Sequence, residues 1–205
     1  MSLLDIHTHH PAPQPQAVIS VSPRDFSPVE GQLYSVGLHP WGGVPSPEDL
    51  TLLDEPAAHP QVVAIGECGI DPLKGAPMFR QLLTFRHHVE LSEQLHKPLI
   101  IHEVKAHDVI TGLRRDLAPV MPWAIHGFRG KPTVAEMLLK AGLWLSFGIR
   151  FNPEALAIVP YDRLLAETDE APVEITKVIA ALSQAAGIEL TDNIAASTAA
   201  FLNIS

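Results

Sequence analysis

Residues 3–9 read LLDIHTH, a short apolar and β-branched run that passes directly into two histidines. Similar runs recur along the chain, each ending at Gly, His, Pro or Asp. Runs of this length that are bounded by turn residues are typical of strands buried on both faces. The runs are LLDIH (3–7), AVISV (17–21), LYSVGLH (33–39), VVAIGE (62–67), PLIIH (98–102), PWAIHG (122–127), LWLSFG (143–148) and LLAETD (164–169).

Helical patterns lie between the later runs. Residues 77–96 open with Pro77, which suits a first helical turn, and apolar residues then recur at spacings of four, three and four from Met78 to Val89. Strands that alternate with helices predict a parallel sheet with right-handed crossovers. Eight strands favour a closed (β/α)8 barrel of the TIM type over an open doubly wound sheet, since no G-x-G-x-x-G follows an early strand. Further helices are expected at about 47–55, 105–117, 132–141, 172–186 and 191–202.

Composition places the chain among ordinary globular proteins. Of 205 residues, 46% are apolar and 18% charged, a balance that supports a sizeable core and excludes a disordered chain. No apolar run approaches the roughly 18 residues of a membrane span, and the first ten residues lack the pattern of a secretory signal. We expect one α/β domain over 1–205, with the Pro-rich stretch 11–15 as a stiff loop.

Charge and cysteine content limit the partners and the compartment. The net charge of −9 argues against tight, non-specific binding to nucleic acid, which depends on Lys and Arg. Cys68 is the one cysteine, so no intramolecular disulfide can form, and a reducing, cytoplasmic setting is expected. Because Cys68 faces away from its neighbour Glu67, we expect it to be a small core residue.

Histidines and acids stand at the ends of the expected strands. Residues two apart on a strand face the same way, so two histidines at the end of the first run converge on one point. In a parallel barrel all these strand ends meet at one mouth, where active sites lie. Four imidazoles and two carboxylates form a mixed ligand set that suits zinc or a similar divalent ion. The candidates are His7, His9, Glu67, His102, His126 and Asp169.

A less specific interpretation stands beside this one. A single histidine near a strand end is more often a packed or hydrogen-bonded residue than a ligand. Six candidates at one end of successive strands are harder to explain in this way, because buried imidazoles and acids cost free energy unless they are paired or bound to a cation. The combination therefore predicts a metal site.

The order and spacing of these motifs resemble the TatD family of metal-dependent hydrolases, within the amidohydrolase superfamily. The likeness spans nearly the whole chain, which resembles a short member of the family. It implies a (β/α)8 barrel, divalent metal ions and hydrolysis of phosphodiesters, usually in DNA. The matching pieces are DIHTH (5–9), GLHPWG (37–42), AIGECGID (64–71), Gln81, Phe85, KPLIIH (97–102), IHGF (125–128), LLAETD (164–169), Asn193 and Phe201.

The resemblance also implies roles for individual residues. One or two divalent ions are expected, with zinc in first place and magnesium or manganese as alternatives. Asp169 would act as the general base towards a metal-activated water, and Glu67 would complete the catalytic pair. His39 and Asp71 match positions that support the ligands, although His39 is equally well read as a packed loop residue. The implied ligands are His7, His9 and Asp169 for one ion, His102 and His126 for the other, and Glu67 between them.

Three departures from the family pattern concern the substrate side. Val104 stands where the family usually has Arg, and His88 stands where it usually has Gln. The chain also runs from ETDEAP at 167–172 straight into a helical pattern, where the family has a longer loop. These departures bear on DNA cleavage more than on metal-dependent hydrolysis.

Positive side chains fall on the loops that follow the expected strands. There they would contact phosphate oxygens while the rest of the surface stays acidic. A tryptophan in the loop after the third run would stack on a base or line the pocket. The alternative is that these loops carry charge only because they are exposed to solvent, and that the tryptophan packs against the rim of the barrel. The expected substrate-binding residues are Lys74, Lys105, Arg129, Lys131, Arg150 and Trp41.

The predicted function is a metal-dependent phosphodiesterase or deoxyribonuclease that acts on single strands or ends, or on a small phosphoester. No G-x-S-x-G motif supports a serine nucleophile. Two rivals stay open. The same centre would serve an amidohydrolase or phosphoesterase with a small-molecule substrate, or a barrel that holds metal and binds a partner without turnover. No membrane partner is expected, and the sequence leaves the oligomeric state open.

Overall fold

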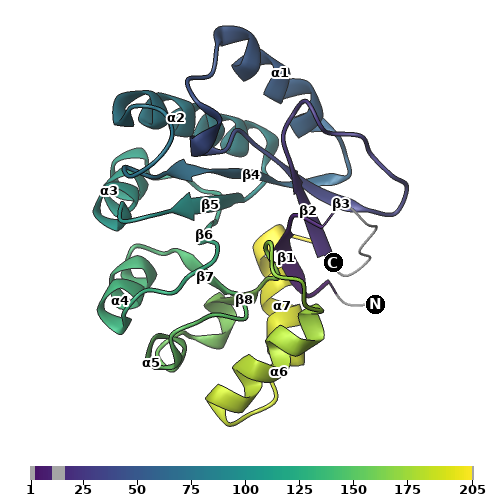
Figure 1. Ribbon diagram of the computed structural model, residues 1–205, viewed down its shortest axis with the longest axis vertical. Helices are drawn as coiled ribbons and strands as arrows, with labels where there is room; N and C mark the ends of the chain where they lie inside the picture. The colour runs from purple at the N-terminus through teal and green to yellow at the C-terminus, as the bar shows by residue number, and fades with distance from the viewer. Residues whose placement is uncertain (1–2, 11–16, 205) are drawn as a thin grey trace.

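Eight parallel strands close a barrel in the computed structural model, which describes residues 3–10 and 17–204 (Figure 1). Each strand pairs with the next along the chain, and the last pairs with the first. The closed ring confirms the barrel and excludes the open sheet. The strands are β1 (Asp5–Thr8), β2 (Ala17–Val21), β3 (Leu33–Val36), β4 (Val62–Ile70), β5 (Leu99–Glu103), β6 (Trp123–Ile125), β7 (Trp144–Phe147) and β8 (Leu164–Ala166).

Helices cover the barrel from outside and follow the later strands, as predicted (Figure 1). No helix stands between β2 and β3. The sequence missed the one-turn α5 and the two 3-10 turns. The helical elements are η1 (Pro40–Gly42), α1 (Pro47–Ala58), α2 (Met78–Leu95), α3 (His107–Leu117), α4 (Pro132–Lys140), α5 (Pro153–Leu156), η2 (Tyr161–Arg163), α6 (Ile175–Ala186) and α7 (Thr191–Leu202).

Local sequence signals explain where the helices begin and end. Ser46 and Asp49 form a reciprocal capping box at the start of α1, which satisfies two backbone donors that the first turn leaves free. α2 ends where His96 adopts a left-handed conformation with φ 54°, and Pro98 then prevents the helix from continuing.

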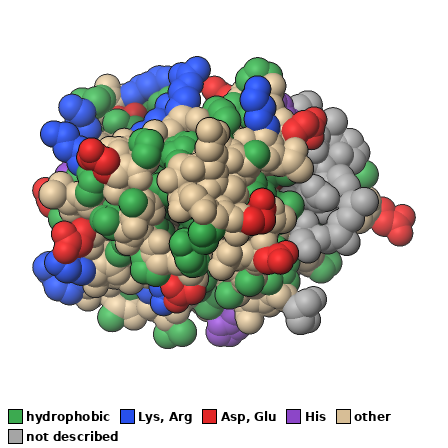
Figure 2. Space-filling model, turned by 90° about the horizontal axis from the view of Figure 1, so that it is seen from below, with side chains coloured by type: hydrophobic (Ala, Val, Ile, Leu, Met, Phe, Trp, Pro, Cys, Tyr) green, Lys and Arg blue, Asp and Glu red, His purple; other side chains and the backbone are tan. Residues whose placement is uncertain are grey.

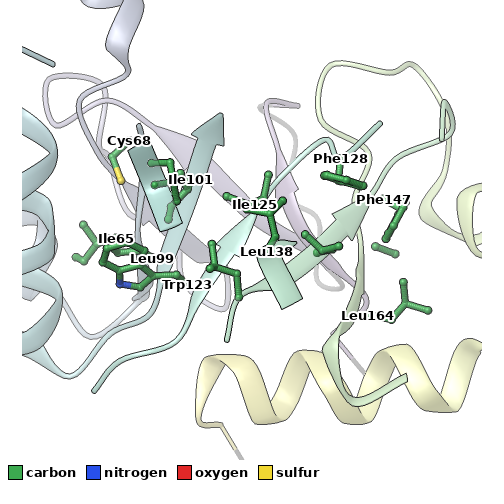
Figure 3. Close-up of a cluster of buried hydrophobic side chains, with 14 of the residues drawn as sticks. Ile65, Cys68, Leu99, Ile101, Trp123, Ile125, Phe128, Leu138, Phe147 and Leu164 are labelled. Carbon is green, nitrogen blue, oxygen red and sulfur yellow. The ribbon is translucent and has the colours of Figure 1, made fainter. Parts of the chain in front are cut away.

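The apolar core has two layers. The larger layer lies between the strands and the helices, where Ile101, Trp123 and Phe147 pack (Figure 3). Cys68 is fully buried in this layer, which confirms its prediction as a core residue. The smaller layer draws residues from strands all round the ring and from the end of α7, and it therefore fills the barrel interior.

Strand alternation brings the polar residues to the mouth. Ile100 and Ala124 belong to the interior layer. His102 and His126 follow each of them by two residues, so they lie on the same side, one step nearer the carboxyl end. The backbones of β4 and β5 lie so close together at Gly69 that any side chain there would overlap the carbonyl of His102 on the paired strand β5.

Most strands differ in length from the predicted runs, and the differences in β4 and β3 bear on the polar residues at the mouth. β4 continues beyond Glu67 to Ile70, and a register irregularity between Ile65 and Cys68 accompanies the extension. β3 stops at Val36, so His39 lies on the loop that leads into η1. No helix in the described chain is both long and apolar enough to cross a membrane. The expected stiff loop at 11–15 lies outside the described residues.

Candidate metal centre

Glu67 lies at the centre of the polar cluster, and its two carboxylate oxygens face different histidines. Oε2 lies 3.4 Å from His7 Nε2 and 3.2 Å from His9 Nε2. Oε1 lies 2.8 Å from His102 Nδ1 and 2.8 Å from His126 Nε2. The carboxylate therefore divides the four imidazoles into two pairs, with one oxygen turned to each.

Asp169 closes the cluster on the side of β1. Its Oδ1 lies 3.8 Å from the Nε2 atoms of both His7 and His9. Its backbone N–H donates to the His7 carbonyl at 3.0 Å, and its carbonyl accepts from His9 N–H at 3.1 Å. Main-chain bonds between the ends of β1 and β8 thus bring three of the six predicted ligands together.

His39 also reaches Glu67, from the loop after β3. Its Nε2 lies 3.0 Å from Glu67 Oε1. Its Nδ1 accepts the backbone N–H of Trp41 at 3.0 Å, so the proton of the neutral ring belongs on Nε2, where it donates to the carboxylate. This arrangement suits a residue that orients Glu67.

Glu167 is a buried acid of the cluster that the sequence reasoning missed. Its Oε1 lies 3.3 Å from His126 Nδ1, and its side chain is fully buried. A proton on Nδ1 that is shared with this carboxylate leaves His126 Nε2 as the atom that faces Glu67. The spacing rule applied to His7 and His9 would have found it, because Glu167 stands two residues before Asp169.

Burial and mutual contacts shift the pKa values in this cluster. Burial opposes ionisation of Glu67, but His126 and the other imidazoles hold the pKa of its carboxyl well below its ordinary value. Burial likewise opposes the charged form of His126, but Glu67 and Glu167 raise its pKa well above the ordinary value. Burial and the neighbouring His126 lower the pKa of His7. The imidazoles therefore keep Glu67 ionised.

Unpartnered buried atoms show that the cluster suits a cation. Both ring nitrogens of His7, Nε2 of His102 and Oε2 of Glu167 make no hydrogen bond among the described residues. Such buried polar atoms are costly when nothing binds them. Donor atoms within 4.8 Å of one another also form several groups of three, including His7 with His9 and Asp169. The residues present fit a divalent ion of the kind that imidazole and carboxylate hold.

Trp41, Asp71 and Lys74 form a second set of contacts beside the centre. The indole N–H of Trp41 donates to Asp71 Oδ2 at 2.7 Å, and Lys74 Nζ lies 3.3 Å from the indole ring centroid. The Trp41 ring also meets the rings of His39 and His102 edge to face. Trp41 is thus held on several sides, and Lys74 covers one of its faces.

The remaining predicted cations lie on the rim. They are exposed, and within the described chain none of them forms an ion pair. They follow β5, β6 and β7 along the chain. Figure 2 shows one outer face, on which Lys and Arg side chains lie mostly along the margin while acidic side chains are scattered. These rim cations are Lys105, Arg129, Lys131 and Arg150.

His88 anchors the His39 loop from α2. Its Nδ1–H donates to the Thr84 carbonyl at 2.7 Å, and its Nε2 accepts the backbone N–H of Leu38 at 2.9 Å. Burial lowers the pKa of His88 to about 4, so the ring is neutral and keeps one donor and one acceptor.

A cavity of about 480 Å³ opens directly from the centre towards β2, β3 and α1. His9, His39 and Glu67 form its inner end, and Arg24 and Asp49 form part of its far end. Its lining includes both apolar and hydroxyl-bearing residues. The candidate metal centre therefore forms one end of this cavity.

Comparisons with known proteins agree with this geometry. The family described as TatD related DNase matches residues 29–200. YabD of Bacillus subtilis (strain 168), named as an uncharacterized metal-dependent hydrolase, is 36% identical over 145 residues, which are 66% of this chain and 57% of YabD. The protein named 3'-5' ssDNA/RNA exonuclease TatD from Erwinia billingiae (strain Eb661) is 32% identical over 151 residues, covering 66% and 56%. The chain thus spans a little over half the length of these relatives.

Solved structures show the same fold. The TatD homologue YjjV of Escherichia coli K12 superposes with a TM-score of 0.84 at 22% identity, over 99% of this chain and 98% of that one. A TatD family hydrolase from Entamoeba histolytica superposes with a TM-score of 0.74 at 14% identity, over 98% of each chain. The family match over residues 29–200 shows that this chain belongs to the TatD family.

Proposed function

We propose that this protein is a divalent-metal-dependent hydrolase that cleaves phosphodiester bonds in single-stranded nucleic acid. The observation that carries the proposal is the position of Glu67, whose two oxygens face two different pairs of histidines. A carboxylate so placed suits a bridge between neighbouring cations, and paired cations are typical of enzymes that hydrolyse phosphate esters. The nucleic-acid substrate is inferred from the relative named as an ssDNA/RNA exonuclease.

The ligands would be the six residues predicted from the sequence. His7, His9 and Asp169 would hold one ion, and His102 and His126 the other, with Glu67 between them. Zinc is proposed in first place because imidazole nitrogen dominates the set, with magnesium or manganese as alternatives. A bound cation would stabilise charge on the phosphoryl oxygens and bring the pKa of a bound water towards neutrality.

The chain's own residues would transfer the proton, position the ligands and contact the substrate. Asp169 would accept the proton of the attacking water, because its carboxylate faces His7 and His9 and is partly exposed. His39 and Glu167 would keep Glu67 and His126 in position. Asp71 would keep Trp41 in position by accepting a hydrogen bond from its indole N–H. The rim cations and Lys74 would contact phosphate oxygens, which suits an acidic protein that must still attract a polyanion.

The loss of the family's Arg at Val104 favours a second candidate substrate class. A small phosphoester or an amide would need fewer cationic contacts than a strand. We further propose a cytoplasmic location, in line with the single unpaired Cys68, and a single catalytic domain.

The test combines elemental analysis with a substrate panel. We expect the purified protein to hold a divalent ion and to cleave single-stranded DNA and a simple phosphodiester such as bis(p-nitrophenyl) phosphate. His7→Ala combined with His9→Ala should remove metal and activity while the barrel stays folded, because the lost side chains lie at the mouth of a preformed scaffold. Unchanged metal content in this variant would refute the ligand assignment. If the metal-loaded parent hydrolyses only neutral esters or amides, the second substrate class would replace phosphodiesters in the proposal.

A further inference from the structure

We propose that Trp41 is a positioning residue, whose indole face holds the Lys74 ammonium at the mouth so that this cation meets a phosphate of the substrate. The inference rests on the proposed function and gives Trp41 a role other than stacking on a base. It follows from the contacts of the indole, from the charge of Lys74 and from the way in which the loop after β4 is held.

The indole of Trp41 contacts both the candidate metal centre and a cation. Its ring meets the rings of His39 and His102 edge to face, at centroid distances of 4.8 and 5.1 Å. Lys74 Nζ lies 3.3 Å from the indole centroid, within the range in which an aromatic face attracts an ammonium. The Lys74 ammonium is therefore one indole ring away from the imidazole of a proposed metal ligand.

An aromatic ring holds a cation without neutralising it. Lys74 is exposed and forms no ion pair within the described chain. Arg24 and Lys140, by contrast, are each bound to a carboxylate, so a phosphate would have to compete with that acid for them. Lys74 thus combines a fixed position with a charge that stays available to a phosphate oxygen.

The same contact argues against a base on this face of the indole. An ammonium 3.3 Å from the centroid occupies the place that a stacked base would take. A base would therefore have to displace Lys74 and give up the attraction between the ring and the cation. The indole is better suited to present the ammonium than to bind a base.

Asp71 fixes the direction of the indole. Its Oδ2 accepts the indole N–H of Trp41 at 2.7 Å, and its Oδ1 accepts the backbone N–H of Leu73 at 2.8 Å. A tryptophan side chain turns about only two bonds, so a hydrogen bond at one end of the ring leaves its face in one direction. The carboxylate of Asp71 thus orients the ring and leaves the ammonium of Lys74 unpaired.

Gln81 holds the backbone of the loop that carries Lys74. It is buried on α2, and its Oε1 accepts the Asp71 N–H at 2.8 Å. Its Nε2 donates to the carbonyls of Asp71 and Lys74 at 2.9 and 3.0 Å. In the same loop, any side chain at Gly75 would overlap the carbonyl of Pro40. The loop after β4 is therefore held against the turn that contains the indole.

The first experiment is a double-mutant cycle on cleavage of single-stranded DNA by the metal-loaded protein. We expect Lys74→Met to raise KM about tenfold, as loss of a hydrogen bond to a charged group does. Trp41→Leu should raise KM about threefold, the scale of one cation–π contact, and Trp41→Phe should raise it less, because an aromatic face remains.

The double variant decides whether Trp41 acts through Lys74. Trp41→Leu combined with Lys74→Met should have the same KM as Lys74→Met alone, because the indole has no ammonium left to hold. Effects on KM that multiply in the double variant would show that Trp41 contacts the substrate itself, and would overturn the inference.

Arg163→Met is the matched control. Arg163 also lies over an indole, 4.7 Å from the ring of Trp144. Trp144 begins β7 and Arg163 directly precedes β8, so this pair lies at the end of the barrel opposite the mouth. KM should stay at the value of the parent. A rise equal to that of Lys74→Met would mean that loss of any positive charge weakens binding, and would also overturn the inference.

NMR spectroscopy measures the position of Lys74 without any turnover. The ring current of Trp41 should shift the ε-methylene signal of Lys74 upfield in the parent, and Lys74→Met identifies that signal by deleting it. In Trp41→Leu the signal should return to the position of a free lysine. An unshifted signal in the parent, or the same shift in Trp41→Leu, would show that the indole does not hold the ammonium.

Failure of the proposed function would look different. A metal-loaded parent that cleaves neither single-stranded DNA nor bis(p-nitrophenyl) phosphate would overturn the proposed function, and this inference with it. Cleavage of single-stranded DNA by the parent with a KM that Lys74→Met leaves unchanged would overturn this inference alone.

Discussion

The buried centre and the exposed rim of the same barrel mouth differ in how firmly the protein holds their side chains. In the centre, two of the rings that face Glu67 have a second contact: His126 meets Glu167, and His39 accepts from the Trp41 backbone. On the rim, Arg129, Lys131 and their neighbours form no ion pair within the described chain. The centre is therefore organised in advance, whereas the role proposed for the rim cations is to attract substrate through charge alone. Substitutions in the two regions should have effects of different size and kind.

The largest effect is expected at Asp169 in the centre. Asp169→Asn keeps nearly the same shape but removes the carboxylate that would accept a proton, so kcat should fall by about 10²–10⁴-fold. Single-turnover rates measured alongside metal content would separate proton transfer from metal loss. Glu170→Gln, which neutralises an exposed acid one residue further on, should leave activity unchanged. Activity of Asp169→Asn within a few-fold of the parent would remove Asp169 from the mechanism.

His88, beneath the His39 loop, should make folding stability depend on pH. Its pKa is about 4 in the folded protein, below the ordinary 6.5 of the unfolded chain. Between these values the unfolded chain binds the extra proton, so stability falls as pH drops from 6.5 to 4, by about 3 kcal/mol over the whole window. Above pH 6.5 the contribution is complete.

Urea unfolding of the parent and of His88→Gln at several pH values would check this. Gln also offers a donor and an acceptor but does not titrate. The unfolding free energy of the parent should therefore fall relative to that of His88→Gln as the pH drops from 6.5 to 4. A difference that stays constant from pH 7 to pH 4 would show that His88 does not remain neutral in the fold.

Glu167 should affect metal affinity more than folding. Glu167→Gln removes the charge that faces His126 Nδ1, and changes of this kind behind a ligand typically cost 10–100-fold in metal affinity. Competition with a chelator would measure the change, and circular dichroism would verify that the barrel persists. Metal affinity equal to that of the parent would mean that His126 needs no carboxylate behind it.

The rim should give the smallest effect and a different one. Removing Arg129 and Lys131 together should raise KM several-fold on a nucleic-acid strand and leave kcat unchanged. Each lost phosphate contact should also lower the slope of log affinity against log salt by roughly one unit. The pair Arg115→Ala and Lys140→Ala, exposed on α3 and α4, is the control. A KM and a salt slope equal to those of the parent would exclude the rim from substrate binding.

The sequence was informative where a local pattern has one geometric outcome. Apolar runs separated by helical stripes led to the barrel, because both faces of its strands are buried and the helices cover the outside. The six polar residues at or near the carboxyl ends of strands were found for a similar reason, although β4 continues beyond Glu67 to Ile70. Parallel strands share one carboxyl end, so their last residues meet wherever the barrel closes. The predicted outward position of Cys68 followed from strand alternation in the same way.

Sequence alone determined the fold class, the helices long enough to show a stripe and the residues that meet at the mouth. Tertiary structure decided how those residues divide: which oxygen of Glu67 faces which pair of histidines, that Glu167 stands behind His126, and that His88 supports the His39 loop. It also decided where the cavity lies relative to the rim cations. These features depend on distances between side chains from different strands and helices. Such distances arise only when the ring closes, so no local periodicity carries them.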